Sequence, residues 1–574
     1  MKKRMIALLM SVCLAASLIS CGENPWKDNS STPSGGSSTP GSSQEQQANE
    51  DRVTEITLPI SEKKLSFSEW RAWSNDWMTN YGEVKGIIEL ENRTNVHVDY
   101  TCVPNAAAVE KYGLMLASGE YTDMIEGNNT NLSYPGGPDT AVADGVFVDM
   151  TDYVYKYMPN YFQLLKDRQD IKEIAITDEG RNVGIYMIRC YVDGKNQQVV
   201  VQNEPAWCGM AVRQDWLDEL NMDLPRTIDQ LYDVLVAFKN NYGAWMHLYT
   251  DGTIGNDYIL SAYGVTQDFY VKDDGKTVGF GPLEPGYKEY VSLMHKWYSE
   301  GLIDPNFTST DSTAILTAHT YYASDKCGVG MSFQGTCGDM HYRNGYTENE
   351  KMWLQPIEGP VLKEGDTTVT TFQSEVACNP QWITKSVAEA DLPYLAQWLD
   401  YHFTYDYAVL ASFGIEGESY VIDESNEWYF VYTDKVKYPE TPGMTPGACR
   451  GTYGMFNNVG YMNWKSGFEL SAFQGITYQA IAYDVWGRQS SDIMIPPSAS
   501  FTPEESSEYS IIYPDIEAYV AESTVKFIVG TDDIEKGWDN FIKTIEGMNI
   551  HRCIDLKQTS LDRYYVKTWL LEGK

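Results

Sequence analysis

The chain has few basic residues for its length. Its 574 residues include 43 Lys and Arg residues against 80 Asp and Glu residues, which gives a formal net charge of −37. A surface this acidic repels the phosphates of nucleic acids and the head groups of anionic lipids. We therefore expect neither a nucleic-acid partner nor charge-driven docking on a membrane.

The sequence also lacks the short motifs of common enzyme and metal sites. It contains no GxGxxG loop, no Walker A loop, no GxSxG elbow and no HExxH motif. The 80 acidic residues leave room for a catalytic carboxylate pair, and Glu416 with Glu418 is one candidate, although solvation at the surface is by far the commoner explanation for such a pair. We expect no enzyme, no cofactor and no metal site.

Long apolar runs are scarce as well. The one marked run, residues 5–20, follows the cations at 2–4 and is too short for a comfortable transmembrane helix. It ends in Ser20 and Cys21, and this segment resembles the signal peptide and lipobox of bacterial lipoproteins. The resemblance implies that the signal is cut before Cys21 and that its thiol is lipidated. An ordinary signal peptide with a chance cysteine is the alternative.

Ser, Gly, Pro and Gln dominate residues 22–51, which contain almost no apolar side chains. Such a segment buries too little surface to fold, so we expect a flexible linker. The predicted organisation therefore begins with a signal peptide at 1–20 and a lipid anchor with its linker at 21–51. The folded body begins at residue 52.

Cysteine is used sparingly in that body. Ten cysteines are present in all, and eight remain once Cys13 in the signal and Cys21 are set aside. None forms a CxxC pair and their spacings match no zinc pattern. Export permits disulfides, but a body of this size does not need them for stability. We expect mostly buried free thiols.

The first part of the body alternates strand and helix patterns. Hydrophobic periodicity predicts strands at 65–73, 96–100 and 123–125 and helices at 84–92 and 109–118. This alternation favours a parallel sheet, in which ligands bind at the carboxyl ends of the strands. The polar loops that follow two of these strands contain candidate ligand-binding amides and acids. They span 74–77 and 127–129.

Start signals for helices recur further along the chain. A second unit begins near Met210 with a helix predicted over 213–220. Three capping patterns each predict a helix N-terminus, and the Asp273–Gly275 run predicts a hairpin turn. The capping pairs are Thr227 with Gln230, Ser386 with Glu389, and Thr502 with Glu505.

Five segments together resemble the extracellular solute-binding proteins of bacterial ABC importers, in the branch of LipO-like lipoproteins. They occur in the family's order, between about residues 70 and 565. They are GLMLASGEYTDMI at 113–125, AVRQDWLDEL at 211–220 followed by LPRT at 224–227, KWYSEGLID at 296–304, GIEGESY at 414–420, and FIVG at 527–530 with Trp538, Gln558 and DRY at 562–564.

The resemblance implies an α/β fold with two lobes, similar to class II periplasmic binding proteins, and a ligand cleft between the lobes. The first lobe is expected to comprise 52–189 and 362–424, and the second 190–361 and 425–574. Ligand binding shifts the balance between open and closed arrangements of such lobes. The implied protein is a lipid-anchored monomer on the outer face of the cytoplasmic membrane that delivers its ligand to the permease subunits of an ABC transporter.

In one respect the sequence departs from some relatives that bind acidic oligosaccharides. Those proteins carry an Asp-rich calcium loop shortly after the Pro-x-Thr helix. Here the stretch reads NNYGAWMH at 240–247, without alternating carboxylates. We therefore expect no calcium site there.

Aromatic residues make up 13% of the chain, and this favours a carbohydrate ligand. Sugars pack their C–H faces on aromatic rings and present hydroxyl groups to carboxylates, amides and Arg. A binding protein for peptides or another small solute is the first alternative, and a surface glycoside hydrolase is the second. For each Trp candidate, a place in a lobe core is the competing interpretation. The candidate stacking residues are Trp73, Trp207, Trp382, Trp464 and Trp486, and the candidate polar partners are Asn75, Asp76, Asn128, Gln334 and Arg488.

Overall fold

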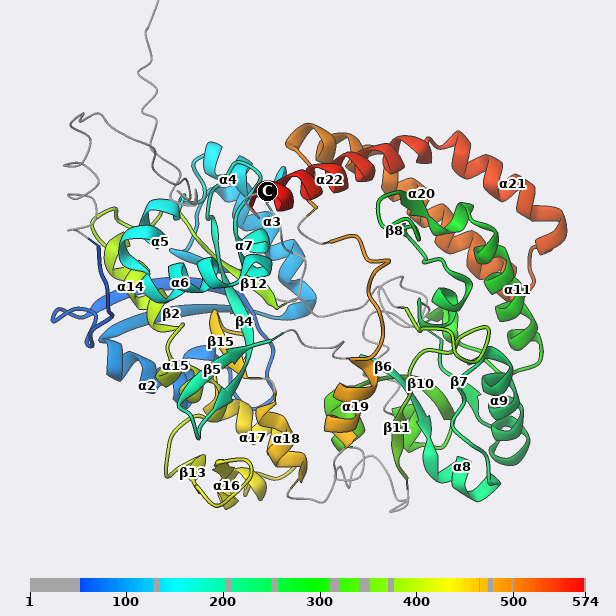
Figure 1. Cartoon of the computed structure of the whole chain (residues 1–574), viewed down its shortest axis with the longest axis horizontal. Helices are drawn as coiled ribbons and strands as arrows, with labels where there is room; N and C mark the ends of the chain where they lie inside the picture. Colours follow the sequence, from blue (N-terminus) through cyan, green and yellow to red (C-terminus); the bar gives the residue numbers. More distant parts are fainter. Residues whose placement is uncertain are drawn as a thin grey trace, which may run out of the picture.

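The computed structural model places the chain in two sheet-centred parts joined by a long helical segment (Figure 1). It describes residues 52–571 apart from 128–131, 133, 203–207, 249–256, 310–319, 340–351, 370–375, 464, 473–477, 497 and 498. Among the helices of these residues, none combines the length and the apolar character needed to cross a membrane.

A seven-stranded sheet forms the centre of the first lobe. Its order is β15-β4-β12-β3-β1-β2, with β5 paired to β4. Strand β1 runs parallel to β2 and β3, whereas β12 runs antiparallel to both β3 and β4. The strands are β1 (Leu65–Ala72), β2 (Val96–Val103), β3 (Met124–Glu126), β4 (Gly184–Asp193), β5 (Gln198–Val201), β12 (Ala377–Ile383) and β15 (Gly460–Asn463).

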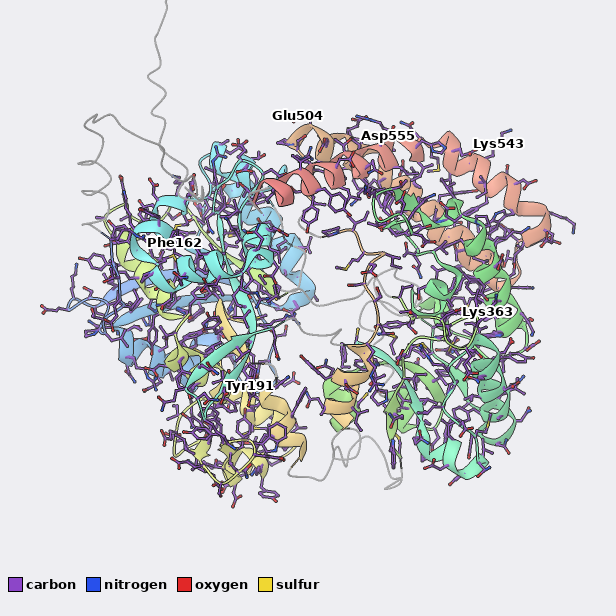
Figure 2. The ribbon with its side chains drawn as sticks, viewed as in Figure 1. Phe162, Tyr191, Lys363, Glu504, Lys543 and Asp555 are labelled. Carbon is purple, nitrogen blue, oxygen red and sulfur yellow. The ribbon has the colours of Figure 1, made fainter. Side chains whose placement is uncertain are left out.

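Helices cover both faces of this sheet and enclose its core, in which Phe162 is one of the buried side chains (Figure 2). A small subdomain of short elements extends the lobe beside β4 and β5. The helices are α2 (Lys85–Thr94), α3 (Ala108–Ser118), α4 (Gly137–Ala143), α5 (Thr151–Tyr157), α6 (Pro159–Asp167), α7 (Gln169–Ala175), α14 (Leu392–Tyr401) and α15 (Tyr405–Phe413). The subdomain contains β13 (Tyr420–Ile422), β14 (Phe430–Tyr432), α16 (Asp434–Lys437), α17 (Pro446–Tyr453) and α18 (Ser466–Ala472).

A four-stranded sheet of order β11-β6-β10-β7 forms the centre of the second lobe. The hairpin of β8 and β9 packs in the same hydrophobic core. The strands are β6 (Cys208–Arg213), β7 (Trp245–Met246), β8 (Phe269–Val271), β9 (Val278–Phe280), β10 (Cys327–Phe333) and β11 (Leu354–Pro356). The helices are α8 (Gln214–Leu220), α9 (Ile228–Tyr242), α10 (Asp257–Leu260), α11 (Pro285–Ser299), α13 (Gln334–Asp339) and α19 (Tyr478–Trp486).

Three C-terminal helices connect the two lobes. They are α20 (Pro503–Val529), α21 (Ile534–Gly547) and α22 (Ile550–Leu571). Apolar residues of all three, among them Ile516, Phe541 and Leu561, pack into the core of the second lobe. The end of α22 reaches back to α7 in the first lobe, where Lys567 donates a hydrogen bond to the carbonyl of Ile176 (Figure 1).

Most of the predicted local elements are confirmed. Strands β1, β2 and β3 and helices α2, α3 and α8 lie within a few residues of their predicted bounds. Capping boxes begin α9 at Thr227 and α20 at Thr502, and the Asp273–Gly275 turn joins β8 to β9. All eight cysteines of the body are free thiols, and six of them are buried.

The prediction that a helix begins at Ser386 is wrong. Helix α14 begins only at Leu392. The Ser386 hydroxyl donates instead to the carbonyl of Tyr121, 3.0 Å away, so it forms a tertiary contact rather than a cap. A capping pattern describes local spacing and takes no account of such a distant partner.

The structure also differs from the predicted lobe boundary at residue 425. Strand β15 pairs in parallel with β4, so it belongs to the first sheet and not to the second lobe. Phe430 and Leu470 pack in one cluster with Cys190 and Val192 of β4. This pairing joins strands that lie far apart in the sequence, and local periodicity does not reveal such partners.

Candidate functional site

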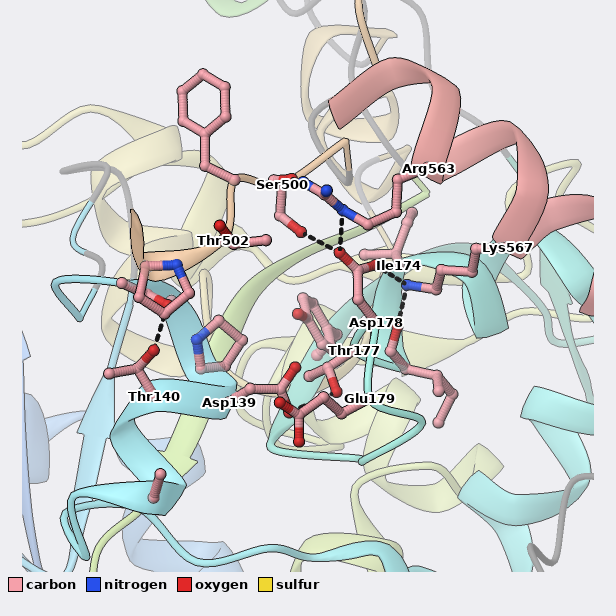
Figure 3. A pocket seen from close by; sticks show the side chains of 18 residues that line it. Asp139, Thr140, Ile174, Thr177, Asp178, Glu179, Ser500, Thr502, Arg563 and Lys567 are labelled. Atoms are coloured by element: carbon pink, nitrogen blue, oxygen red, sulfur yellow. Dashed lines mark hydrogen bonds and ion pairs between the residues drawn. The ribbon is translucent and has the colours of Figure 1, made fainter. Parts of the chain in front are cut away.

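A cavity of about 500 Å³ lies where the C-terminal helices meet the first lobe (Figure 3). The first lobe contributes α4, residues 174 and 176–179, and Tyr186. The other wall comes from residues 500–503 at the start of α20 and from α22. Because these helices pack on the second lobe, the cavity is bounded by both halves of the molecule.

Asp178 is the central charged group of this cavity. Its Oδ2 atom lies 3.3 Å from Nε of Arg563 and accepts a hydrogen bond from the Ser500 hydroxyl at 2.9 Å. Its Oδ1 atom lies 3.6 Å from Nζ of Lys567. One carboxylate of the first lobe therefore binds two cations of the last helix, as Figure 3 shows.

The two cations of α22 are well supplied with partners. Arg563 also pairs with Glu505 at 2.6 Å and donates to the carbonyl of Ser500 at 2.8 Å. The hydrogen bond to Glu505 raises the pKa of Arg563, whereas burial lowers the pKa of Lys567. The capping box at Thr502 holds Glu505 in place, because the Glu505 side chain accepts from the Thr502 N–H at 2.8 Å.

A second charged group lines the side of the cavity that belongs to α4. Asp139 accepts hydrogen bonds from the Thr177 hydroxyl at 2.8 Å and from Arg181 at 3.0 Å. Arg181 also pairs with Glu179 at 2.7 Å, and Glu179 is more than half exposed. The cavity thus presents carboxylates and hydroxyl groups side by side.

An aromatic recess of about 120 Å³ adjoins the cavity, and Thr177 and Tyr186 line both spaces. In its lining, Trp382 stacks on Phe147, with ring centroids 5.3 Å apart and planes 12° apart. Tyr134 meets Phe147 edge to face at 5.9 Å. The recess and the cavity together offer rings beside polar groups, which is the combination that a sugar requires.

Glycines make room for the indole of Trp382. Strand β12 pairs Trp382 with Gly184 of β4, and Gly127 follows β3 on the other side. A Cβ atom on Gly127 would lie 2.8 Å from the indole ring, and one on Gly184 would lie 3.0 Å from Pro380. Any larger residue at Gly127 would displace the ring, so this backbone shapes the recess.

The predicted site residues are not all brought together. Trp382 lines the recess but is only 7% exposed. Trp73 is half-buried and packs edge to face on Tyr81 at 5.7 Å. Asn75 accepts hydrogen bonds from two backbone N–H groups of its own loop, at 2.8 and 3.1 Å, and Asp76 is exposed. Trp73, Asn75 and Asp76 line neither of the two spaces.

Two predicted residues of the second lobe have different surroundings. Gln334 is buried at the start of α13. Arg488 is more than half exposed and pairs with Asp484, one turn earlier. Neither residue lines the cavity or the recess. The remaining predicted residues lie outside the described part of the chain, and they are Cys21, Asn128, Trp207 and Trp464.

The prediction that Trp486 stacks on a ligand is wrong for this structure. Its side chain is 1% exposed, and its indole N–H donates to the carbonyl of Met210 at 3.2 Å. The ring lies against Gly209 of β6, where a Cβ atom would come within 2.4 Å of it. Trp486 is a core residue, as the competing interpretation held.

Sequence reasoning missed most of the residues that line the cavity. Tyr186 lies on β4 in a strand that pattern analysis did not single out, and Asp178 lies in a short turn after α7. Arg563 appears in the sequence analysis only as part of the DRY pattern at 562–564. No local signal links it to Asp178, because the two residues meet only through the packing of α22.

No family model matches the chain. Curated relatives nevertheless cover much of it. The fructooligosaccharide ABC transporter substrate-binding protein FusA of Streptococcus pneumoniae is 23% identical over 535 residues, which are 89% of this chain and 92% of FusA. The polygalacturonan/rhamnogalacturonan-binding protein YtcQ of Bacillus subtilis is 26% identical over 58% of this chain and 63% of its own length. The lipoprotein LipO of Bacillus subtilis is 25% identical over 58% of this chain and 64% of LipO.

This chain is similar in sequence and fold to ABC-transporter substrate-binding proteins. FusA in complex with kestose superimposes with a TM-score of 0.64 at 20% identity, over 88% of this chain and all of the other. The alginate-binding protein AlgQ2 without calcium ion gives a TM-score of 0.65 at 19% identity, with the same coverage. The expected two-lobed solute-binding fold is confirmed. The names of FusA and YtcQ both describe binding proteins.

Proposed function

We propose that the chain captures a sugar or oligosaccharide outside the cell and delivers it to the permease of an ABC importer. The observation that carries this proposal is the cavity with its aromatic recess at the junction of the two halves. The fold and the sequence likeness to FusA, whose name states a fructooligosaccharide ligand, support the same function.

The chemistry of the lining suits a sugar. Tyr186 offers a ring face for C–H groups beside the buried rings that shape the recess, while Thr177 and Asp139 offer hydrogen-bonding groups for hydroxyls. A volume of about 500 Å³ lies within the ordinary range of small-molecule sites, ~300–1,000 Å³. The described residues that line the cavity all belong to one chain, and we propose that the protein binds its ligand as a monomer.

The position of the cavity suggests how a permease could recognise the ligand-bound protein. A ligand that contacts both α4 and α22 stabilises the arrangement in which these elements are close together. It therefore shifts the lobe populations by its differential affinity for that arrangement. The permease would then recognise the lobes in the arrangement that the ligand favours.

The amino-terminal segment supports attachment to the outer face of the cytoplasmic membrane. We propose that Cys21 is the lipid-modified residue and that residues 22–51 form the tether. A flexible tether of thirty residues spans about 30 Å root-mean-square. This length keeps the folded body near a permease in the same membrane. The likeness to LipO, a lipoprotein, agrees with this arrangement.

A thermal-shift and calorimetric screen of the purified chain against mono- and oligosaccharides tests the function. A ligand at 100 times its Kd should stabilise the fold by about 2.7 kcal/mol. Peptides serve as the comparison set, and chromatography of the saccharides after incubation detects turnover. Stabilisation by peptides alone, or hydrolysis of a bound saccharide, would contradict the proposal.

A further inference from the structure

We propose that the cavity selects uncharged saccharides and discriminates against those that carry carboxylates. This inference rests on the proposed function, because it assumes that the cavity is the sugar site. It deepens that function by naming the class of ligand. The relatives do not decide the question, since FusA is named for fructooligosaccharides and YtcQ for polygalacturonan, whose sugars are acidic.

The charges that line the cavity are unbalanced in favour of acids. Three carboxylates, those of Asp139, Asp178 and Glu179, face two cations, Arg563 and Lys567. The wider surface has the same sign, because the chain carries a formal net charge of −37. An anionic sugar is therefore repelled both on approach and within the site.

Arg563, whose guanidinium would suit a ligand carboxylate best, is already paired with two carboxylates of the protein. Arg563 lies between Asp178, with Nε at 3.3 Å, and Glu505, with Nη2 at 2.6 Å. A uronate would have to displace one of these carboxylates to reach the guanidinium. The displaced carboxylate would then remain beside the ligand as a like charge, which opposes binding.

The other two cations of the region are held in the same way. Lys567 lies 3.6 Å from Asp178 and donates to the carbonyl of Ile176. Arg181 lies 3.0 Å from Asp139 and 2.7 Å from Glu179. Each of these cations has an acidic partner from the protein itself, so none offers an unopposed positive charge to a ligand.

The remaining polar groups suit hydroxyl donors. The side chain of Glu179 is 59% exposed, and Asp139 and Asp178 also line the cavity. Carboxylates only accept hydrogen bonds, and a neutral sugar presents several hydroxyl donors. A uronate replaces one such donor group with a further acceptor. The same lining that attracts a neutral sugar therefore opposes an acidic one.

The test compares matched ligands on the purified full chain. Trigalacturonate is measured by calorimetry beside its carboxyl-reduced neutral counterpart, together with kestose and neutral malto- and galacto-oligosaccharides. We expect at least one neutral saccharide to bind, and trigalacturonate to bind at least tenfold more weakly than that ligand. Equal or tighter binding of trigalacturonate would overturn the inference while leaving the proposed function intact. Binding of no saccharide would instead overturn the proposed function, and the inference with it.

Two variants locate the discrimination. Asp178→Asn removes the shared partner of Arg563 and Lys567, and it should strengthen trigalacturonate binding relative to neutral binding by at least threefold. Asp484→Asn is the control, because it makes the same change of charge at an exposed pair with Arg488. Glu505→Gln removes the ion pair between Arg563 and Glu505, and this variant replaces Asp178→Asn if that variant folds poorly. An unchanged ratio in both variants of the cavity, or the same change in the control, would overturn the inference.

Discussion

Trp382 and Phe147 stack face to face, with centroids 5.3 Å apart and planes 12° apart, although they come from different segments of the first lobe. Both residues line the aromatic recess. Both side chains are buried, with exposures of 7% and 0%. The pair therefore shapes the recess more than it contacts a ligand. The half-buried Tyr186, which lines both spaces, is the ring best placed for contact.

The first prediction concerns this ring. Tyr186→Ala should weaken saccharide binding by about 5- to 150-fold, because loss of a stacked ring removes on the order of 1–3 kcal/mol. Calorimetry with the saccharide found in the screen measures the change. Tyr394→Ala is the matched control, since Tyr394 is 40% exposed on α14 and lines neither space. Wild-type affinity in the Tyr186 variant would remove this ring from the site.

The second prediction tests whether Trp486 is a core residue or a ligand contact. Trp486→Ala should lower the free energy of unfolding by about 3–5 kcal/mol, the usual range for a buried Trp. The ring packs on Gly209 and its N–H bonds to the carbonyl of Met210, which also accepts from the Ile357 N–H, so its loss leaves a cavity and removes one of two hydrogen bonds to that carbonyl. Denaturant unfolding measures the change. A variant with unchanged stability but weakened binding would restore Trp486 to the candidate ligand contacts.

The third prediction concerns pH. Burial lowers the pKa of His402 to about 3, and its Nδ1 atom lies 2.7 Å from the carbonyl of Trp398. In the unfolded chain a His has a pKa of about 6.5. As the pH falls from about 6.5 towards 3, the unfolded chain binds a proton that the folded chain does not, so stability falls. At pH 5 this effect amounts to about 2 kcal/mol.

His402→Asn isolates this effect, because Asn keeps a donor for the Trp398 carbonyl and does not titrate. The stability difference between wild type and variant should change by about 2 kcal/mol between pH 7 and pH 5, in the direction that disfavours the wild type in acid. Burial raises the pKa of Asp400 to about 7 in both proteins, so its contribution largely cancels in the difference. His551→Asn, at an exposed residue, is the control for the substitution itself. A pH-independent difference for the His402 variant would contradict the assignment.

The fourth prediction concerns the anchor. Cys21→Ser should release the protein from the membrane into the medium or the soluble fraction, because the thiol that accepts the lipid is lost. Fractionation followed by immunoblotting measures the release. Cys102→Ser, in the folded body, should leave the distribution unchanged. Equal retention of the Cys21 variant in the membrane fraction would show that the chain is held by other means.

Much of the local structure could be predicted because it depends on neighbouring residues. Thr227 and Thr502 cap their helices through partners three residues away, and spacing alone reveals such pairs. Ser386 shows the same spacing but bonds to Tyr121, 265 residues away, so no helix begins there. The pairing of β15 with β4 was not predicted from the sequence for the same reason, because local periodicity does not identify the partner of a strand.

The amino-acid sequence by itself indicated an acidic α/β chain, and its resemblance to solute-binding proteins predicted the two lobes that the structure shows. It also determined which short segments form helices and strands, because periodicity and caps act within a few residues. Only the tertiary structure decided which residues form the candidate site. Lys567 meets Ile176 across 391 residues of chain, and Asp178 meets Arg563 beside them. Such contacts form because α22 packs along both lobes, and that packing depends on the whole core rather than on any one segment.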